Sequence, residues 1–511
     1  MKVNQLKAGA IMSYLIIGLG SLISIVYTPI MLRLLGQSEF GLYNLVASVV
    51  SYLGLFNFGF GSAYIKYYSG YKVAKDEESI AKLNGIFMII FGILGTIAIL
   101  CGIVLVYYTD AIFGTKLSLA ELSKAKVLMA LMVVNIAITF PCIVFNSYVT
   151  ANEKFIFQRL LQIARIVTSP FLILPILIMG YGSIGMVIVT TVINFIIELI
   201  NLIFSYKKIH IKFSYKNLDI SLVRELFVFS SYIFLNLVVN QINWNVDRFI
   251  IGRFRGTIEV ATYSVAAQLN SYYLQLSTAI SGVYIPRVNS LVASKNGNSA
   301  LSELFTRLGR LQFIMLSLIL TGLIFFGKAF ICLWAGKNYA ASYPIALVLI
   351  IPVTIPLIQN LGIEIQRAKN MHKFRSWVYF FIALGNVGLS IPLVKLYGGL
   401  GAAIGTGLAL IVGNVFFMNW HYHHKVGLDI KRFTKAIAKT FPSLVIPSIV
   451  GTLMFMYLNL MNVKILIVAI LVYTVIFCFS MWYIGMNNYE KQLISRPLSR
   501  MTRKLSKKNN N

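Results

Sequence analysis

Long apolar stretches, separated by short polar segments, recur along the whole chain of 511 residues. A helix needs about 20 mostly apolar residues to cross a bilayer, and it satisfies its own backbone hydrogen bonds there. Fourteen stretches meet this requirement, at residues 10–33, 40–65, 83–108, 125–149, 157–179, 183–206, 226–251, 259–285, 309–327, 341–366, 376–395, 399–421, 437–459 and 463–485. The pattern therefore predicts an all-α integral membrane protein with fourteen transmembrane helices and no inserted soluble domain.

The basic residues of the connecting segments predict the orientation of these helices. When the N-terminus is placed inside, the cytoplasmic segments hold 34 of the 45 Lys and Arg residues, and every inner segment contributes. Such an excess marks the cytoplasmic side. Because the number of helices is even, both termini are expected in the cytoplasm. The last segment, from Lys491 to Lys508, is then a basic tail near the anionic inner leaflet or a simple topology anchor.

Composition agrees with a membrane protein. Hydrophobic residues make up 58% of the chain and charged residues 12%, and the mean hydropathy is +0.78. A soluble domain has about twice this share of charge. The net charge of +29 would also suit a nucleic-acid-binding protein. Here the basic residues stand in clusters between apolar runs, so they are interpreted as a topology signal and no nucleic-acid partner is predicted.

The sequence lacks the motifs of several other function classes. It has four cysteines without a C-x-x-C pair, which predicts no disulfide framework and no zinc site. It has no G-x-x-x-x-G-K-[ST] loop, so no built-in ATPase is expected. His421, His423 and His424 are interpreted as a solvated cluster rather than a metal site. The first apolar run reaches about Leu32, which is too long for a signal peptide, and is expected to remain as the first span.

Two patterns occur twice in the same order. Residues 36–47 (G-x-x-E-F-G-x-Y-x-L-V-A) recur at 256–267 (G-x-x-E-V-A-x-Y-x-V-A-A), with an offset of 220. Residues 181–190 (Y-G-x-x-G-x-x-I-x-T) recur at 397–406, and Lys154-Phe155 recurs as Lys373-Phe374. Spans one to six therefore correspond to spans seven to twelve. Because six is even, the halves share one orientation, which is typical of transporters that bind cargo between parallel repeats.

The repeat predicts how the chain is divided. The N-lobe comprises residues 1–206 and is followed by a cytoplasmic linker at 207–225. The C-lobe comprises residues 226–424. Two further spans occupy residues 425–486, and a basic cytoplasmic tail occupies 487–511.

Several short motifs carry a family resemblance. They are Asn245-Val-Asp-Arg-Phe-Ile-Ile-Gly252, Ala151-Asn-Glu-Lys-Phe155, the segment Ala368–Arg375 with His-Lys-Phe-Arg at its end, and Tyr397-Gly-Gly-Leu-Gly-Ala-Ala-Ile-Gly-Thr406. In this order, on fourteen spans, the chain resembles the Wzx-type polysaccharide flippases of the multidrug/oligosaccharidyl-lipid/polysaccharide exporter superfamily. The resemblance implies a MATE-like arrangement of two six-helix lobes around a cationic cavity, and no enzymatic activity.

The same resemblance implies a cargo and partners. Oligosaccharide repeat units on undecaprenyl diphosphate would cross from the inner to the outer leaflet of a bacterial cytoplasmic membrane by alternating access. The product would be a capsule, an O-antigen or an exopolysaccharide. Membrane lipids would surround the protein, and a polymerase and glycosyltransferases would be its partners. No cofactor is expected, and coupling to the membrane potential, to H+ or to Na+ stays open.

Polar side chains form stripes within two predicted spans. Asn236, Asn240, Asn243 and Asp247 recur in steps of 4, 3 and 4, which places them on one face of a helix. Ser264, Gln268, Ser271, Gln275 and Thr278 form a second stripe. Polar groups that face lipid would be unpaired, so these faces are expected to meet protein or water. The first stripe favours a wet cavity wall that binds sugar hydroxyls. The second suits a cavity wall and polar helix packing equally.

Basic residues at the inner helix ends are candidates for binding the diphosphate. They are Lys66, Arg159, Arg165, Arg287 and Arg367. The alternative for each is simple anchoring at the inner surface, with the side chain reaching toward water. Arg165 differs because it lies about two turns inside its predicted span.

Charged residues inside membrane helices are candidates for gating or coupling. Asp247 and Arg248 lie near the outer end of the seventh span, and Arg33 near that of the first. The repeat suggests an Asp247–Arg33 pair that closes an outer gate. Glu198 and Glu364 are candidates for carrying a coupling proton, and pairing of Glu364 with Arg367 is the structural alternative.

Other functions stay open. A multidrug exporter of the same superfamily usually carries cationic cargo, which this basic cavity mouth disfavours. A lipid II flippase would need the same chemistry. A membrane-embedded polymerase or glycosyltransferase would need a sizeable outer loop or paired carboxylates, and the longest outer loop, at 109–124, holds only Asp110 and Glu121.

Overall fold

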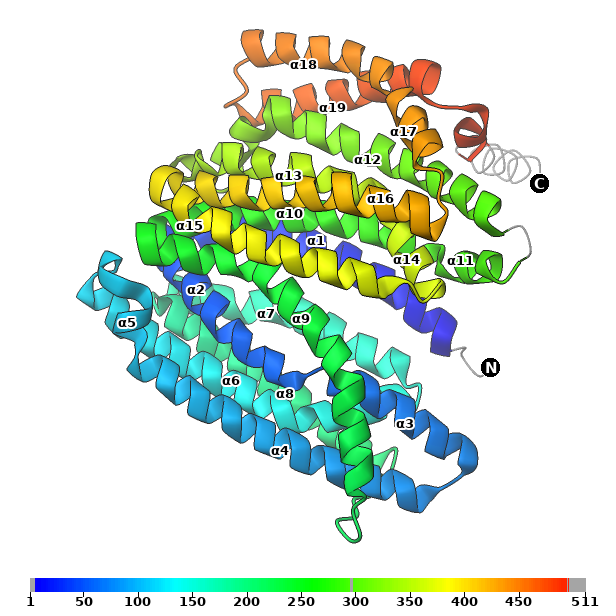
Figure 1. Cartoon of the computed structure of the whole chain (residues 1–511). Coiled ribbons are helices and arrows are strands. Elements are labelled where there is room, and N and C mark those ends of the chain that lie inside the picture. The colour runs from blue at the N-terminus through cyan, green and yellow to red at the C-terminus, as the bar shows by residue number, and fades with distance from the viewer. Residues whose placement is uncertain (1–4, 295–296, 494, 496–511) are drawn as a thin grey trace, which may run out of the picture. The chain divides into compact units, whose positions relative to one another are not determined.

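The computed structural model describes residues 5–294, 297–493 and 495, and every regular element in this part of the chain is a helix (Figure 1). The all-α prediction is therefore confirmed. The helices form two compact units. Unit 1 comprises residues 1–265 and 383–406, and unit 2 comprises residues 266–382 and 407–511. Most of the predicted basic tail, at 494 and 496–511, lies outside the described residues.

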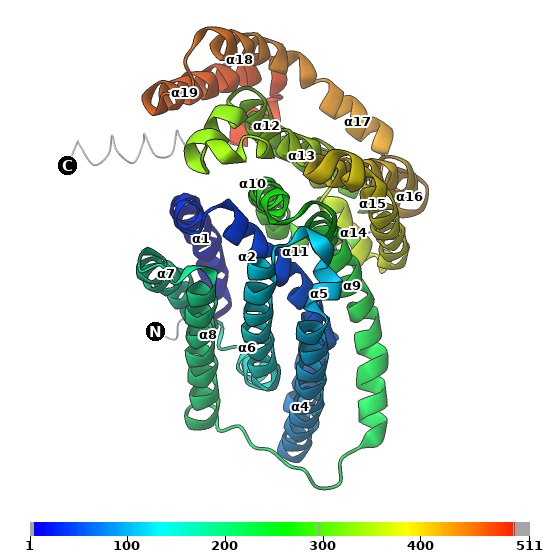
Figure 2. The same cartoon turned by 90° about the vertical axis from the view of Figure 1, so that its left-hand side faces the viewer.

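Unit 1 is built from long helices that pack in an antiparallel series. Its helices are α1 (Gln5–Leu35), α2 (Gln37–Val50), α3 (Phe60–Ala74), α4 (Glu77–Tyr107), α5 (Thr109–Phe113), α6 (Leu119–Ala151), α7 (Phe155–Ile178), α8 (Gly182–Lys207), α9 (Ile220–Arg255), the first turns of α10 (Thr257–Val283) and the middle part of α15 (His372–Ile411). Helix α6 packs between α4 and α8, and α1 packs on α7 (Figure 2). Short 3-10 helices, η1 (Ser51–Asn57) and η2 (Gly114–Lys116), complete the unit.

Unit 2 is organised around the 38-residue helix α12. Its helices are α11 (Ile285–Val292), α12 (Gly297–Trp334), α13 (Ser342–Ile358), α14 (Leu361–Ala368), parts of α15 (His372–Ile411), α16 (Asn419–His421), α17 (Ile430–Ala438), α18 (Val445–Tyr457) and α19 (Val463–Ser480). Helix α12 contacts α13, α17, α18 and α19. The short segments are η3 (Lys337–Tyr339), η4 (Val412–Met418), η5 (Tyr422–Val426), η6 (Phe441–Leu444) and η7 (Met481–Gly485).

Local capping starts several helices where the chain leaves a loop. The Asp76 carboxylate accepts a hydrogen bond from the backbone N–H of Ser79 at 2.9 Å, and Asp219 does the same for Ser221 at 2.8 Å. Hydrogen bonds from Ser79 lower the pKa of Asp76, and those from Ser221 lower the pKa of Asp219. A carboxylate at this position satisfies amide groups that have no partner within the helix.

Fewer helices than fourteen pass a test of length and hydropathy. Among the described residues, 11 pass it singly, or up to 12 when α13 and α14, which meet at a bend of 43°, count as one span. Residues 373–426 pass as one 54-residue stretch. This stretch is a hairpin, because Tyr379 bonds Asn414 and Thr406 bonds Asn386 across it. Helix α10 is absent from the count because the polar side chains of its predicted stripe lower its hydropathy.

The two units are a division by contacts, and the lobe boundary between residues 206 and 226 stays a prediction from the repeat. Helix α9 packs on α2 and α3, so it belongs to unit 1. The two copies of the first repeated pattern also meet in this unit. A Cβ on Gly41 would overlap the carbonyl oxygen of Thr257, and Gln37 donates to Thr262 at 3.1 Å. The missing side chain at Gly41 thus permits close backbone approach between the copies.

Candidate functional site in the membrane helices

Each copy of the first repeated pattern contributes a glutamate that caps a helix of the second pattern. In the first half, the Glu39 carboxylate accepts hydrogen bonds from the N–H of Ser183 at 2.6 Å and from its hydroxyl at 2.7 Å. Lys124 lies 3.1 Å from the same carboxylate. Gly182 has a φ of +56°, and a Cβ there would overlap Glu39. A negative charge at the start of α8 is stabilised by the helix dipole.

The second half repeats this contact with different neighbours. Glu259 accepts a hydrogen bond from the N–H of Gly399 at 2.7 Å, directly after the turn of the α15 hairpin. Gly398 has a φ of +60°, and a Cβ there would overlap the Glu259 carboxylate. Arg255 donates to the carbonyl oxygens at the end of the preceding arm, including that of Lys395 at 2.8 Å. The corner between α9 and α10 therefore holds both sides of the hairpin turn.

Asp247 is the centre of a buried polar cluster in unit 1. Its side chain is 2% exposed. Its carboxylate accepts hydrogen bonds from the hydroxyls of Tyr263 and Thr406, both at 2.7 Å, and from Ser390 at 3.1 Å. Tyr263 belongs to the repeated pattern at 256–267, and Thr406 is the last residue of the pattern at 397–406. One residue from each repeated pattern therefore binds this carboxylate.

Asn386 completes the cluster. Its Oδ1 lies 2.9 Å from the Ser390 hydroxyl and 3.0 Å from the Thr406 hydroxyl, while its buried Nδ2 has no partner. Each hydroxyl has one proton, and both are needed by Asp247. A half-turn of the amide would let Nδ2 donate to the two hydroxyl oxygens.

Arg248 supplies nearby positive charge. Its guanidinium donates to Asn245 at 2.9 Å and interacts electrostatically with Asp247, Tyr263 and Tyr43. The carboxylate of Asp247 is enclosed by hydroxyls, and Arg33, its predicted gate partner, is exposed on α1. The Asp247–Arg33 gate stays a prediction, and the adjacent Arg248 adds a positive charge beside Asp247.

The predicted stripe on α9 divides into two parts. Asn236 and Asn240 are exposed, whereas Asn243 is 8% exposed and Asp247 is buried. The amides at one end can therefore meet water or cargo, and the groups at the other end support helix packing. Gln241, on another face of α9, donates to Ser51.

The predicted stripe on α10 lies beside a second polar face that the sequence analysis missed. Gln268 donates to Tyr272 at 2.8 Å, and Gln275 is exposed. In unit 2, the hydroxyl of Ser277 donates to the carbonyl of Leu357 at 2.9 Å, and Gln312 donates to the Ser277 carbonyl at 3.1 Å. The Ser277 hydroxyl thus joins α10 to a neighbouring helix, which is the polar helix packing that the sequence offered as the alternative to a cavity wall.

The five candidate diphosphate ligands are divided between the units. Lys66, Arg159 and Arg165 lie in unit 1, and Arg287 and Arg367 lie in unit 2. The Lys66 ammonium lies 4.4 Å from the centre of the Phe229 ring, which is a cation–π contact. Arg159 donates to Gln162 at 2.9 Å. Arg287 is exposed on α11.

The candidate coupling carboxylates have different surroundings. Glu364 forms an ion pair with Arg367 at 2.9 Å, which is the structural alternative expected from the sequence. Glu198 accepts a hydrogen bond from Asn146 at 2.9 Å and interacts electrostatically with Arg165, which is exposed on the neighbouring helix α7. Arg165 is therefore accessible, on a helix next to a partly buried carboxylate.

The sequence is similar to proteins of surface polysaccharide synthesis. Residues 6–292 match the family described as polysaccharide biosynthesis protein. A putative O-antigen transporter of Shigella flexneri is 23% identical over 412 residues, which cover 79% of this chain and 94% of that protein. The teichuronic acid biosynthesis protein TuaB of Bacillus subtilis strain 168 is 25% identical over 234 residues, or 44% of this chain and 46% of that protein.

The fold is similar to those of solved transporters. The lipid II flippase MurJ, in an inward closed conformation, superposes with a TM-score of 0.70 at 18% identity, covering 96% of this chain and 99% of that one. An inward-facing multidrug resistance transporter of the MATE family and the MOP superfamily gives 0.62 at 14% identity, covering 82% and 96%. The fold is therefore MATE-like. Because the family match covers more than half of the chain, the protein belongs to the polysaccharide biosynthesis protein family, as the flippase-like motifs indicated.

Proposed function

We propose that the protein is a flippase for oligosaccharide repeat units linked to undecaprenyl diphosphate. It moves them from the inner to the outer leaflet of the bacterial cytoplasmic membrane by alternating access, without an enzymatic step. Glycosyltransferases act on the cargo before transport, and a polymerase acts on it afterwards. The names of the Shigella and Bacillus relatives support a cargo destined for surface polysaccharide.

The observation that carries the proposal is the exposed polar face of α9. Asn236 and Asn240 are exposed within a helix long and apolar enough to cross a membrane. Amides that faced hydrocarbon would lose several kcal/mol each, so this face must meet water, protein or cargo. Amide groups donate and accept hydrogen bonds, which suits the hydroxyls of a sugar. The exposed cation Arg165 adds a charge that suits a diphosphate.

A deletion strain provides the test. Loss of the gene should cause lipid-linked repeat units to accumulate in the inner leaflet, and the wild-type gene should remove them. The double variant Lys66→Ala and Arg165→Ala should restore less than about a tenth of transport, because phosphate contacts by two cations are lost. Leaflet-specific labelling of the lipid-linked sugar measures this.

The matched control changes two exposed lysines that are predicted to lie outside the cytoplasm, Lys116→Ala and Lys464→Ala, and should transport normally. Full transport by the Lys66 and Arg165 variant at equal expression would remove the proposed role of these cations. Accumulation of lipid II in place of sugar repeat units would assign the protein a different cargo.

A further inference from the structure

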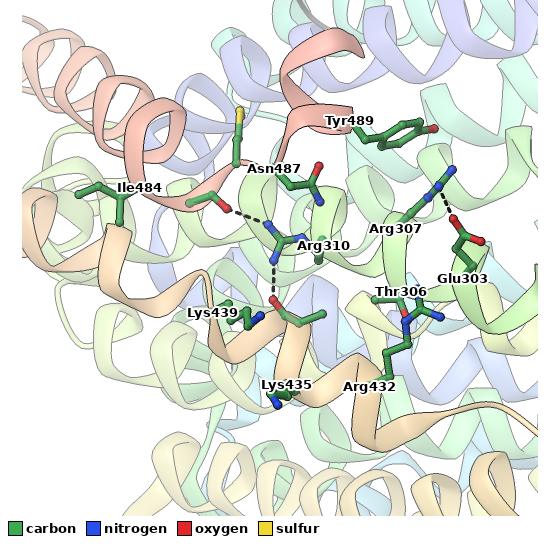
Figure 3. A pocket seen from close by; sticks show the side chains of 13 residues that line it. Glu303, Thr306, Arg307, Arg310, Arg432, Lys435, Lys439, Ile484, Asn487 and Tyr489 are labelled. Atoms are coloured by element: carbon green, nitrogen blue, oxygen red, sulfur yellow. Dashed lines mark hydrogen bonds and ion pairs between the residues drawn. The ribbon is translucent and has the colours of Figure 1, made fainter.

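A basic pocket lies in unit 2, apart from every polar group considered above. It is formed by α12, by the amphipathic helix α17 and by the segment that follows α19 (Figure 3). Its volume is about 720 Å³. The basic residues that line it are Arg307, Arg310, Arg432, Lys435 and Lys439. These segments lie at the cytoplasmic ends of their spans, according to the orientation that the distribution of Lys and Arg predicts.

Two of these cations are already engaged. The buried guanidinium of Arg310 bonds both oxygens of Glu490, at 2.6 and 3.0 Å. It also donates to the carbonyls of Ala436 and Gly485 (Figure 3). Arg307 pairs with Glu303, and its guanidinium lies 4.4 Å from the centre of the Tyr489 ring. These bonds join α12, α17 and the C-terminal segment into the walls of the pocket.

The other three cations have no carboxylate partner among the described residues. Arg432 and Lys435 lie on α17 and Lys439 is its C-cap residue. They follow one another in steps of 3 and 4, so they lie on one side of the helix. All three are exposed. The pocket thus has five positive charges against Glu303 and Glu490. An excess of three like charges on one wall attracts an anion.

Packing places α17 firmly on α12. Its other face buries Ile430, Phe433 and Ile437. The Phe433 ring lies 4.7 Å from that of Phe305 between centres, and a Cβ on Gly309 would overlap Phe433. The Asp429 carboxylate caps the helix through the N–H of Arg432 at 2.9 Å. The helix that presents the cations is therefore fixed on α12 before any ligand binds, so its backbone does not have to be ordered on binding.

The mouth of the pocket is also apolar. Ile484 lines it and is 48% exposed, and Phe441, two residues after Lys439, is 55% exposed. Tyr489 lines it and is 38% exposed. Aromatic residues of this kind are enriched where a membrane protein crosses the headgroup region. A cationic wall beside exposed apolar side chains suits an amphiphile, whose phosphate would lie among the cations and whose chains would lie along Phe441 and Ile484.

We propose that this pocket binds the phosphodiester headgroup of an anionic phospholipid from the surrounding leaflet. The occupant is a resident bilayer lipid and not the cargo. Apart from α12, the pocket is lined by α17 and the segment after α19, which follow the repeated part of the chain, and it uses none of the residues proposed to bind the diphosphate. The lipid would hold α17 against the C-terminal segment.

The test uses the purified full-length protein in a neutral detergent. Phosphatidylglycerol, phosphatidylcholine and inorganic phosphate are added separately, and bound molecules are counted by native mass spectrometry. Wild-type protein should retain phosphatidylglycerol and neither of the other two. The double variant Arg432→Gln and Lys435→Gln should bind phosphatidylglycerol about tenfold more weakly, since basic residues near a membrane surface each add to anionic lipid binding.

The matched control removes two exposed cations that do not line the pocket, Lys425→Gln and Lys431→Gln, and should bind as the wild type does. If the double variant does not fold, the single variant Lys439→Gln takes its place and should also bind phosphatidylglycerol more weakly than the wild type. Equal phosphatidylglycerol binding by the pocket and control variants would overturn the proposal. Retention of inorganic phosphate alone would also overturn the proposal. Displacement of phosphatidylglycerol by an equal amount of a polyprenyl diphosphate would overturn it too, because the pocket would then be a cargo site. Because no transport is measured, a failure here leaves the proposed flippase function unaffected.

Discussion

At the scale of single residues, Asp247 shows how a carboxylate can be kept inside a membrane protein. Its oxygens accept hydrogen bonds from three hydroxyls, and Arg248 supplies charge close by. An ionisable group without such partners would be costly there, and such groups usually serve a function. Here the hydroxyl donors come from α10 and from both arms of the α15 hairpin, so the cluster ties three helices to α9.

Removing this carboxylate should destabilise the protein measurably. Asp247→Ala would leave the Tyr263 hydroxyl without its acceptor and would leave Ser390 and Thr406 with the Asn386 oxygen alone. We expect a loss of about 1–3 kcal/mol. Thermal unfolding in detergent measures the difference. Asp110→Ala serves as the control, because Asp110 is exposed and pairs with Lys126 at 2.8 Å on the surface, where ion pairs contribute little. Equal unfolding temperatures for the two variants would show that the Asp247 cluster adds nothing to stability.

At the scale of elements, the two repeated patterns form one contact that occurs twice. A glutamate of the first pattern meets a glycine turn of the second, as Glu39 meets Gly182 and as Glu259 meets Gly398. The glycines are required at these turns for two reasons. Their φ angles are positive, and a side chain would collide with the carboxylate. The repeat is therefore visible in the sequence because both sides of a contact recur together.

The turn of the α15 hairpin should tolerate no side chain. Gly398→Ala is expected to lower stability by about 1–3 kcal/mol, because alanine is strained at positive φ and would displace Glu259. Gly388→Ala, on the same helix, should be neutral or slightly stabilising, since a Cβ there meets no atom within 4 Å. The yield of folded protein and its unfolding temperature compare the two. Gly398→Ala as stable as Gly388→Ala would contradict the assigned role of this turn.

At the scale of the whole molecule, the proposed cargo makes transport sensitive to voltage. A lipid diphosphate carries about two negative charges, and each charge that crosses 100 mV changes the free energy by about 2.3 kcal/mol. An inside-negative potential should therefore favour outward movement by roughly 5 kcal/mol if both charges cross the full field.

Reconstituted vesicles with a potassium gradient test this expectation. Valinomycin sets the potential, and leaflet-specific labelling follows the lipid-linked sugar. Outward flipping should be favoured when the cytoplasmic side is negative and disfavoured when the gradient is reversed. Flipping that is indifferent to the sign of the potential would indicate that the charge of the cargo is compensated during transport, for example by H+ or Na+.

The sequence alone determined that the chain crosses a membrane many times, that its first twelve spans repeat, and that it resembles polysaccharide flippases. These conclusions depend on local properties, because an apolar helix satisfies its own backbone hydrogen bonds wherever it lies in the bilayer. The predicted number of fourteen spans is not confirmed by hydropathy, which identifies 11 or up to 12 among the described residues. The Gly398 turn joins two spans into one stretch, and the polar face of α10 lowers its hydropathy.

Only the tertiary structure decided which polar groups meet. Asp247 is 143 residues from Ser390 and 159 from Thr406, and Arg310 is 180 from Glu490. A side-chain pair that distant depends on how whole helices pack, and neither spacing nor composition specifies that packing. Sequence reasoning therefore identified Asp247 but not the hydroxyls that bind it, and it missed the basic pocket at α17. The physical reason is that membrane insertion is decided segment by segment, whereas a site is assembled from side chains of several segments at once.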